Sequence, residues 1–82
     1  MKTTLHLIVL APDRVCCDAD VSAATFPGAE GPFSVWPNHA PLVAALNEGT
    51  IRYTDARGVH TIETDGGFLR VENNRIEVCI GI

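Results

Sequence analysis

The stretch from Pro27 to Leu42 constrains the fold of this chain more than any other. It contains four prolines and two glycines, which interrupt apolar residues at close intervals. Because proline lacks a backbone N–H group and its ring disrupts a helix interior, no long helix can pass through this stretch. The spacing therefore predicts two tight turns around a short strand.

Strand patterns separated by turn residues recur along the rest of the chain. Residues 51–54 and 59–64 flank a turn at 55–58, and residues 68–72 and 75–80 flank the pair Asn73-Asn74. Glycine and asparagine tolerate the positive φ angles that such hairpin loops require. Short strands at intervals of about eight to twelve residues predict an all-β fold, an antiparallel sandwich or barrel of about eight to ten strands. We interpret residues 1–82 as a single domain.

Three segments carry more specific expectations. Residues 4–11 have apolar side chains on both faces, as in a strand that is covered on both sides. Residues 15–17 and 21–26 are predicted to be two strands, joined as a hairpin by an acidic turn at 18–20. Residues 41–46 fit a short helix or a strand, because periodicity alone cannot separate the two.

Composition and charge exclude several classes of protein. Of the 82 residues, 46% are hydrophobic and 20% charged, which is typical of a folded globular domain. The net charge is −4, Lys2 is the only lysine, and the arginines are scattered among acidic residues. Nucleic-acid binding is not expected, since it needs a clustered basic surface. A chain this short buries roughly 60–65% of its unfolded surface, so an interface with a larger partner would add to a marginal stability.

Membrane insertion is not expected either. The longest aliphatic run, Leu7 to Ala11, ends at Pro12 and is too short to span a bilayer. We also find no signal peptide, and we expect a soluble, cytoplasmic chain that meets a membrane only through another protein.

The cysteines are expected to be reduced. They are odd in number, and Cys16 and Cys17 are adjacent, so their side chains point to opposite faces of a strand. Neither they nor Cys79 have the spacing to histidines that a metal site requires. We therefore expect a reduced monomer when the chain is isolated.

No catalytic, cofactor or metal site is predicted. His39 lies in a turn-rich loop but has no nucleophile elbow beside it, so a small hydrolase is the weakest interpretation. The preferred role is a hydrogen bond that fixes the turn at residues 37–41 or an interface. Gly28 and Gly31 lack the lysine and following helix of a phosphate loop. Asp18, Asp20 and Glu30 lack the ligand spacing of a calcium loop. The aromatic residues Phe33 and Trp36 are expected in the core, and a partner contact is the alternative.

Two motifs together indicate a family. The tetrapeptide His39-Ala40-Pro41-Leu42 follows a Pro-Gly turn, and Gly66-Gly67-Phe68-Leu69-Arg70-Val71 lies some thirty residues further on. This combination resembles the amino-terminal β-sandwich of the epsilon subunit of F-type ATP synthases, which is called delta in mitochondria. The resemblance extends over nearly the whole chain and favours a strand at 41–46.

The resemblance implies a ten-stranded antiparallel β-sandwich and a role in the central stalk, the rotor of the complex. Members bind the γ subunit and rest on the polar loops of the membrane c-ring, and they do no chemistry. By this resemblance the partner-binding residues include Glu30, Gly31 and Pro32 near the c-ring, and Trp36, Asn38, His39 and Leu42 near γ. The implied location is the cytoplasmic face of the bacterial inner membrane, as a peripheral protein.

The sequence departs from the family pattern at several points. Pro32 stands where an acidic or polar residue is common, and Cys17 and Ala19 replace an aromatic residue and a glycine. The family's carboxyl-terminal helices have no counterpart before Ile82, so we expect a short form or an excised domain that neither binds ATP nor inhibits hydrolysis by extending. The rival reading is a free β-sandwich module that binds a peptide or sugar beside Trp36.

Overall fold

The computed structural model describes residues 2–81, which form nine strands and no helix. The all-β fold is therefore confirmed: nine strands fall within the eight to ten that the pattern predicts and are one fewer than the ten that the resemblance implies. In chain order the strands are β1 (Leu5–Ala11), β2 (Arg14–Val21), β3 (Ala23–Phe26), β4 (Phe33–Val35), β5 (Leu42–Leu46), β6 (Gly49–Asp55), β7 (Gly58–Thr64), β8 (Gly67–Glu72) and β9 (Arg75–Ile80).

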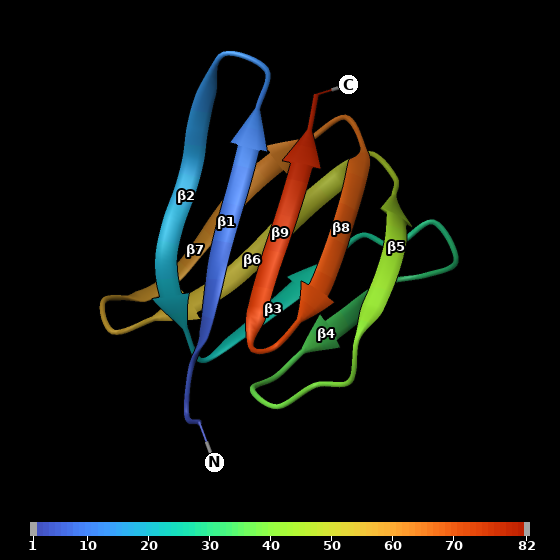
Figure 1. Ribbon diagram of the computed structural model, residues 1–82. Coiled ribbons are helices and arrows are strands. Elements are labelled where there is room, and N and C mark those ends of the chain that lie inside the picture. Colours follow the sequence, from blue (N-terminus) through green and yellow to red (C-terminus); the bar gives the residue numbers. More distant parts are fainter. Residues whose placement is uncertain (1, 82) are drawn as a thin grey trace.

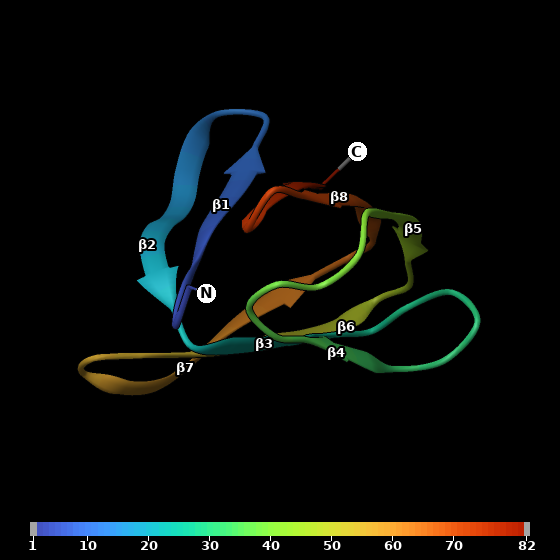
Figure 2. The ribbon, with the colours of Figure 1, turned by 60° about the horizontal axis from the view of Figure 1, so that its bottom comes forward.

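The strands form two sheets that pack face to face as a sandwich (Figures 1 and 2). The five-stranded sheet has the order β2-β1-β9-β8-β5, and the four-stranded sheet has the order β4-β3-β6-β7. All pairs are antiparallel except β1 and β9, which run parallel at the centre of the larger sheet. The chain crosses between the sheets four times, so β4 and β5 end up on the same side of the sandwich.

The expected hairpin through residues 18–20 is wrong. β2 runs without a turn from Arg14 to Val21, and β3 belongs to the other sheet. Asp18 and Asp20 lie opposite Ile8 and His6 of β1, with their side chains exposed. The acidic residues fit the strand because they occupy its solvent-facing positions.

The outer face of β1 is also more open than predicted. Leu5, Leu7 and Val9 are buried as expected, but Leu10 is exposed on the opposite face. His6 and Ile8 on that face are only partly buried, so the strand is fully covered on one side only. The ambiguous segment 41–46 is a strand, β5, as the resemblance favours.

The two predicted hairpin loops are confirmed. Asn73 and Asn74 have φ angles of 52° and 59° between β8 and β9, and Gly58 has a φ of 123° after the β6–β7 turn. These are conformations that asparagine and glycine adopt more readily than other residues.

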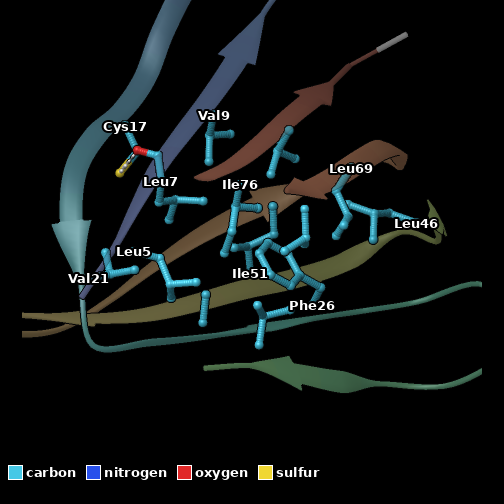
Figure 3. Close-up of a cluster of buried hydrophobic side chains, with 14 of the residues drawn as sticks. Leu5, Leu7, Val9, Cys17, Val21, Phe26, Leu46, Ile51, Leu69 and Ile76 are labelled. Carbon is cyan, nitrogen blue, oxygen red and sulfur yellow. Dashed lines mark hydrogen bonds between the residues drawn. The ribbon is translucent and has the colours of Figure 1, made fainter. Parts of the chain in front are cut away.

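The core lies between the sheets, and Figure 3 shows side chains from both of them interdigitating. Burying each large aliphatic or aromatic side chain contributes about 1.5–3 kcal/mol to stability. The alternate residues Ile76, Val78 and Ile80 of β9 are all buried in this core. The largest fully buried side chains are Phe26, Leu5, Leu7, Ile51, Leu69 and Ile76.

Candidate partner-binding site

The loop at residues 27–32 connects β3 to β4 and is held by a tight turn. Gly31 donates its N–H to the carbonyl of Gly28 at 3.0 Å. A Cβ atom at Gly28 would lie 2.5 Å from the Gly31 carbonyl oxygen and 2.8 Å from the ring of Phe33, so only glycine fits there. At Gly31 the backbone has a φ of 128°, which again favours glycine.

This 27–32 loop is fastened to the end of β5. The N–H of Ala29 donates to the carbonyl of Ala45 at 2.9 Å, and the N–H of Asn47 donates to the carbonyl of Pro27 at 2.8 Å. The two bonds make an antiparallel bridge between Gly28 and Leu46. The loop therefore extends the five-stranded sheet for a short distance, while Glu30, Gly31 and Pro32 remain exposed to solvent.

The 36–41 loop connects β4 to β5 and is pinned by an amide pair. Asn38, with a φ of 67°, donates its backbone N–H to the Asn74 side-chain oxygen. Its side-chain amide donates to the carbonyl of Lys2 at 3.0 Å and accepts from Nδ2 of Asn74 at 3.2 Å. Asn38 thus ties the loop to the β8–β9 turn and to the segment that precedes β1.

His39 and Trp36 lie on the surface of the same loop. The Nδ1 atom of His39 donates to the carbonyl of Ala40 at 2.6 Å, which agrees with the loop-fixing role expected for it. Trp36 is 48% exposed, so the expectation that it fills the core is wrong. Phe33 instead packs against the core, with its ring centroid 5.7 Å from that of Phe26.

A groove of about 500 Å³ lies between the 27–32 loop and β5. The groove lies on the side of the sandwich formed by the edge strands β4 and β5, residues of which line it. Figure 2 shows these two strands and the 27–32 loop on the same side of the molecule. Most of its surface is apolar, and the small side chains of β5 leave the space unfilled. Its lining residues are Gly28, Ala29, Glu30, Gly31, Phe33, Ser34, His39, Leu42, Val43, Ala44 and Ala45.

The groove unites only part of the predicted site. Glu30, Gly31, His39 and Leu42 line it, although they come from two different loops and a strand. The other three predicted residues lie outside it: Pro32 and Trp36 are exposed, and Asn38 is occupied by internal hydrogen bonds. Sequence reasoning missed the alanines of β5, whose small size was the available signal.

The electrostatics of the site are simple. Glu30 is the one carboxylate that lines the groove, and it makes no ion pair among residues 2–81. Within those residues there is no cluster of histidine, cysteine or carboxylate side chains that could hold a metal ion. No helix long and apolar enough to cross a membrane occurs in the same range.

Three of the shifted pKa values belong to groups away from the groove. A hydrogen bond to Asp20 raises the pKa of His6, whose other ring nitrogen lies 2.6 Å from Asp18. A hydrogen bond with Cys17 raises the pKa of Tyr53 to about 12, and burial raises the pKa of the Cys17 thiol. These groups lie on β1, β2 and β6, on the other side of the sandwich from β4 and β5.

Residues 4–81 match the family described as ATP synthase, Delta/Epsilon chain, beta-sandwich domain. The chain belongs to this family. Among curated relatives, it is 38% identical to the ATP synthase epsilon chain of Nitratidesulfovibrio vulgaris and 37% identical to that of Carboxydothermus hydrogenoformans. Each alignment covers 95% of this chain but only 58% of the relative, so the chain spans somewhat more than half of their length.

Solved structures share the delta/epsilon β-sandwich fold. A chain in the cryo-EM structure of Euglena gracilis mitochondrial ATP synthase, with OSCP, F1 and the c-ring, superposes with a TM-score of 0.90. The match covers 98% of this chain and 52% of that one, at 20% identity. A chain of the Tetrahymena thermophila central stalk and c-ring gives a TM-score of 0.78 at 15% identity, over 94% and 63% of the two chains. Both likenesses establish the fold.

Proposed function

We propose that this chain is a central-stalk subunit of an F-type ATP synthase, which binds the γ subunit and the polar loops of the c-ring. In that role it helps couple ion translocation to ATP synthesis and carries torque without catalysing a reaction. The observation that carries the proposal is the family match over residues 4–81, together with relatives named ATP synthase epsilon chain. The subunit then lies at the cytoplasmic face of a bacterial inner membrane, held there by its partners.

The groove and the two loops beside it indicate where the partners would bind. We assign Gly31 and Pro32 at the exposed tip to the c-ring and the segment from Trp36 to Leu42 to γ. Glu30 lines the groove beside that segment, so we assign it to the border between the two partners. Both segments are stiffened in this structure, the first by backbone bonds to β5 and the second by Asn38 and two prolines. Stiff loops lose little conformational entropy when they dock, which favours a lasting interface.

A free peptide- or sugar-binding module is the second candidate, and the groove is the observation in its favour. Trp36, however, does not line the groove. The outer face of the five-stranded sheet also exposes large apolar side chains, with Leu10 at 38%, Phe68 at 56% and Val43 at 74%. Because exposed apolar surface of this kind usually marks a protein interface, it favours the stalk subunit.

Co-expression with the γ subunit from the same source, followed by size-exclusion chromatography, tests the proposal. We expect the two chains to elute together. His39→Ala should weaken that association by about tenfold while the melting temperature changes little, because His39 is exposed and bonds only within its own loop. Separate elution of the wild-type chains would contradict the proposal. A sharply lower melting temperature with unchanged γ binding would mean that His39 is purely structural.

A further inference from the structure

β5 is an edge strand of the five-stranded sheet, and one side of its backbone faces the groove. In an antiparallel pair, every second residue exchanges backbone hydrogen bonds with the neighbouring strand. The residues between them direct their N–H and C=O groups away from that strand. The carbonyl of Ala45 accepts from Ala29, on the side away from β8. Val43, two residues earlier, therefore also directs its N–H and C=O groups away from β8.

Part of this strand edge is unoccupied. Among residues 2–81, no backbone group pairs with the outward N–H and C=O of Val43 or with the N–H of Ala45. The 27–32 loop pairs only with the far end of β5, at Leu46. Unpaired groups along a strand edge are a template on which another strand can form.

We propose that the groove receives an extended segment of a protein partner, which pairs with β5 as an additional strand. The segment exchanges backbone hydrogen bonds with Val43, and its inward side chain enters the gap between β4 and β5. This inference deepens the proposed function by naming how a partner binds, and it rests on that function for the identity of the partner.

The lining of the groove specifies the chemistry of that segment. Leu42 and Ala44 are the inward-facing residues of β5, and Phe33 faces them from β4. This wall suits one apolar side chain. The carboxylate of Glu30 makes no ion pair among residues 2–81, so charge complementarity favours a lysine or arginine in the segment at that point.

Hydrogen exchange of single amides, measured by NMR, tests the added strand directly, with the γ subunit from the same source as the probe. In the free chain we expect the amides of Val43 and Ala45 to exchange quickly, while the amide of Ala44, bonded to β8, exchanges slowly. Saturation with γ should slow the Val43 amide by at least about tenfold, because a strand hydrogen bond must then open before exchange. An unchanged Val43 rate in the saturated complex would overturn the inference.

Two variants change the groove while leaving the hydrogen bonds between β5 and β8 in place. Val43→Pro removes the outward donor without removing a bond to β8, and edge strands accept such prolines. Ala44→Leu narrows the gap from within, and its matched control is Ala56→Leu on the exposed β6–β7 turn. We expect Val43→Pro and Ala44→Leu each to weaken γ binding by about tenfold or more, and the control to leave it unchanged.

A charge reversal tests the cation assigned to the segment. Glu30→Lys should weaken γ binding by about five- to tenfold at low salt, whereas Glu48→Lys, an equal charge change outside the groove, should alter it less than twofold. Equal effects of the two reversals would overturn the assignment.

The failures of the two proposals are distinguishable. If γ binds wild type, Val43→Pro and Ala44→Leu equally well, the added strand is wrong and the stalk function stands. If γ does not bind the wild-type chain at all, both proposals are wrong.

Discussion

The two edges of the sandwich, one closed at β2 and β7 and the other open at β4 and β5, are built in opposite ways. On the closed edge, Tyr53 of β6 contacts Cys17 of β2, and its ring stacks on His60 of β7 with centroids 5.1 Å apart. His60 in turn lies 2.9 Å from Asp55. On the groove edge, between β4 and β5, the facing residues are alanines and a glycine-rich loop.

The two edges differ in the size of their side chains and in whether their backbone hydrogen-bonding groups are paired. Aromatic rings fill the closed edge, and their polar atoms find partners within the fold. The small residues of β5 leave about 500 Å³ unfilled and leave strand groups unpaired. Natural sandwiches usually protect their edges, so an edge left open beside stiff loops is a candidate binding surface.

The largest loss of stability is expected at Gly28, where the 27–32 loop packs most tightly. Gly28→Ala would force a Cβ atom to within 2.5 Å of the Gly31 carbonyl oxygen and should lower the free energy of unfolding by about 2–3 kcal/mol. Urea denaturation followed by circular dichroism measures this. Gly58→Ala is the control, because its φ of 123° adds strain without any clash, and we expect a loss of only about 1 kcal/mol. A smaller loss for Gly28→Ala than for the control would mean that the 27–32 loop adapts freely.

The next largest loss of stability is expected from breaking the amide pair of Asn38 and Asn74, which holds the 36–41 loop. Asn38→Gly removes two side-chain hydrogen bonds but tolerates the φ of 67°, and should cost about 1 kcal/mol. Asn38→Ala adds strain at the same φ and should cost about 2 kcal/mol. The fluorescence of Trp36, the only tryptophan, reports unfolding of this loop. If both variants unfold like wild type, the pin is dispensable and the loop is held by its prolines.

Alkaline titration probes the closed edge. Tyr53 is the only tyrosine, so absorbance of the phenolate reports it alone. With a pKa of about 12, it should be almost entirely neutral at pH 10.5, where an unperturbed tyrosine is about three-quarters ionised. Because the folded pKa lies above the unfolded one, stability should fall as the pH rises from about 10 to about 12. Cys17→Ala removes the hydrogen-bond partner and should lower this pKa, and an unchanged value would argue against the Cys17 contact.

The smallest effect concerns His6, on the solvent side of β1. Both ring nitrogens face carboxylates, Asp18 and Asp20, and both can donate only when the ring is protonated. The raised pKa therefore adds stability that is full below about pH 6.5 and is lost as the pH rises through the folded pKa. Because the pair is exposed, the change should be slight. An NMR titration should give His6 a higher pKa in wild type than in Asp20→Asn; equal values would argue against the hydrogen bond between His6 and Asp20.

Sequence reasoning succeeded where neighbours along the chain decide the conformation. The asparagine turn at 73–74 and the glycine at 58 follow from the φ angles these residues tolerate. It failed at Asp18 and Asp20, which resemble turn residues but occupy the exposed face of a continuous strand. Trp36 was also misjudged, because large aromatic residues usually lie inside and nothing local indicates that its loop stays on the surface.

The site was predictable in its residues and not in its shape. The motif at 39–42 and the Pro-Gly turn indicated the two loops through resemblance, yet only four of the seven predicted residues line the groove. The groove depends on how β5 crosses to the larger sheet and on the bonds between Ala29 and Ala45.

By itself, the sequence determined the all-β class, the hairpin loops and the family, because alternation, turn residues and motifs are properties of short segments. Only the tertiary structure decided that β1 runs parallel to β9, that the chain crosses between sheets after β2, and that β4 and β5 enclose an open edge. These features join residues that are far apart along the chain. Local patterns allow many strand pairings equally, and dense packing of the whole core selects among them.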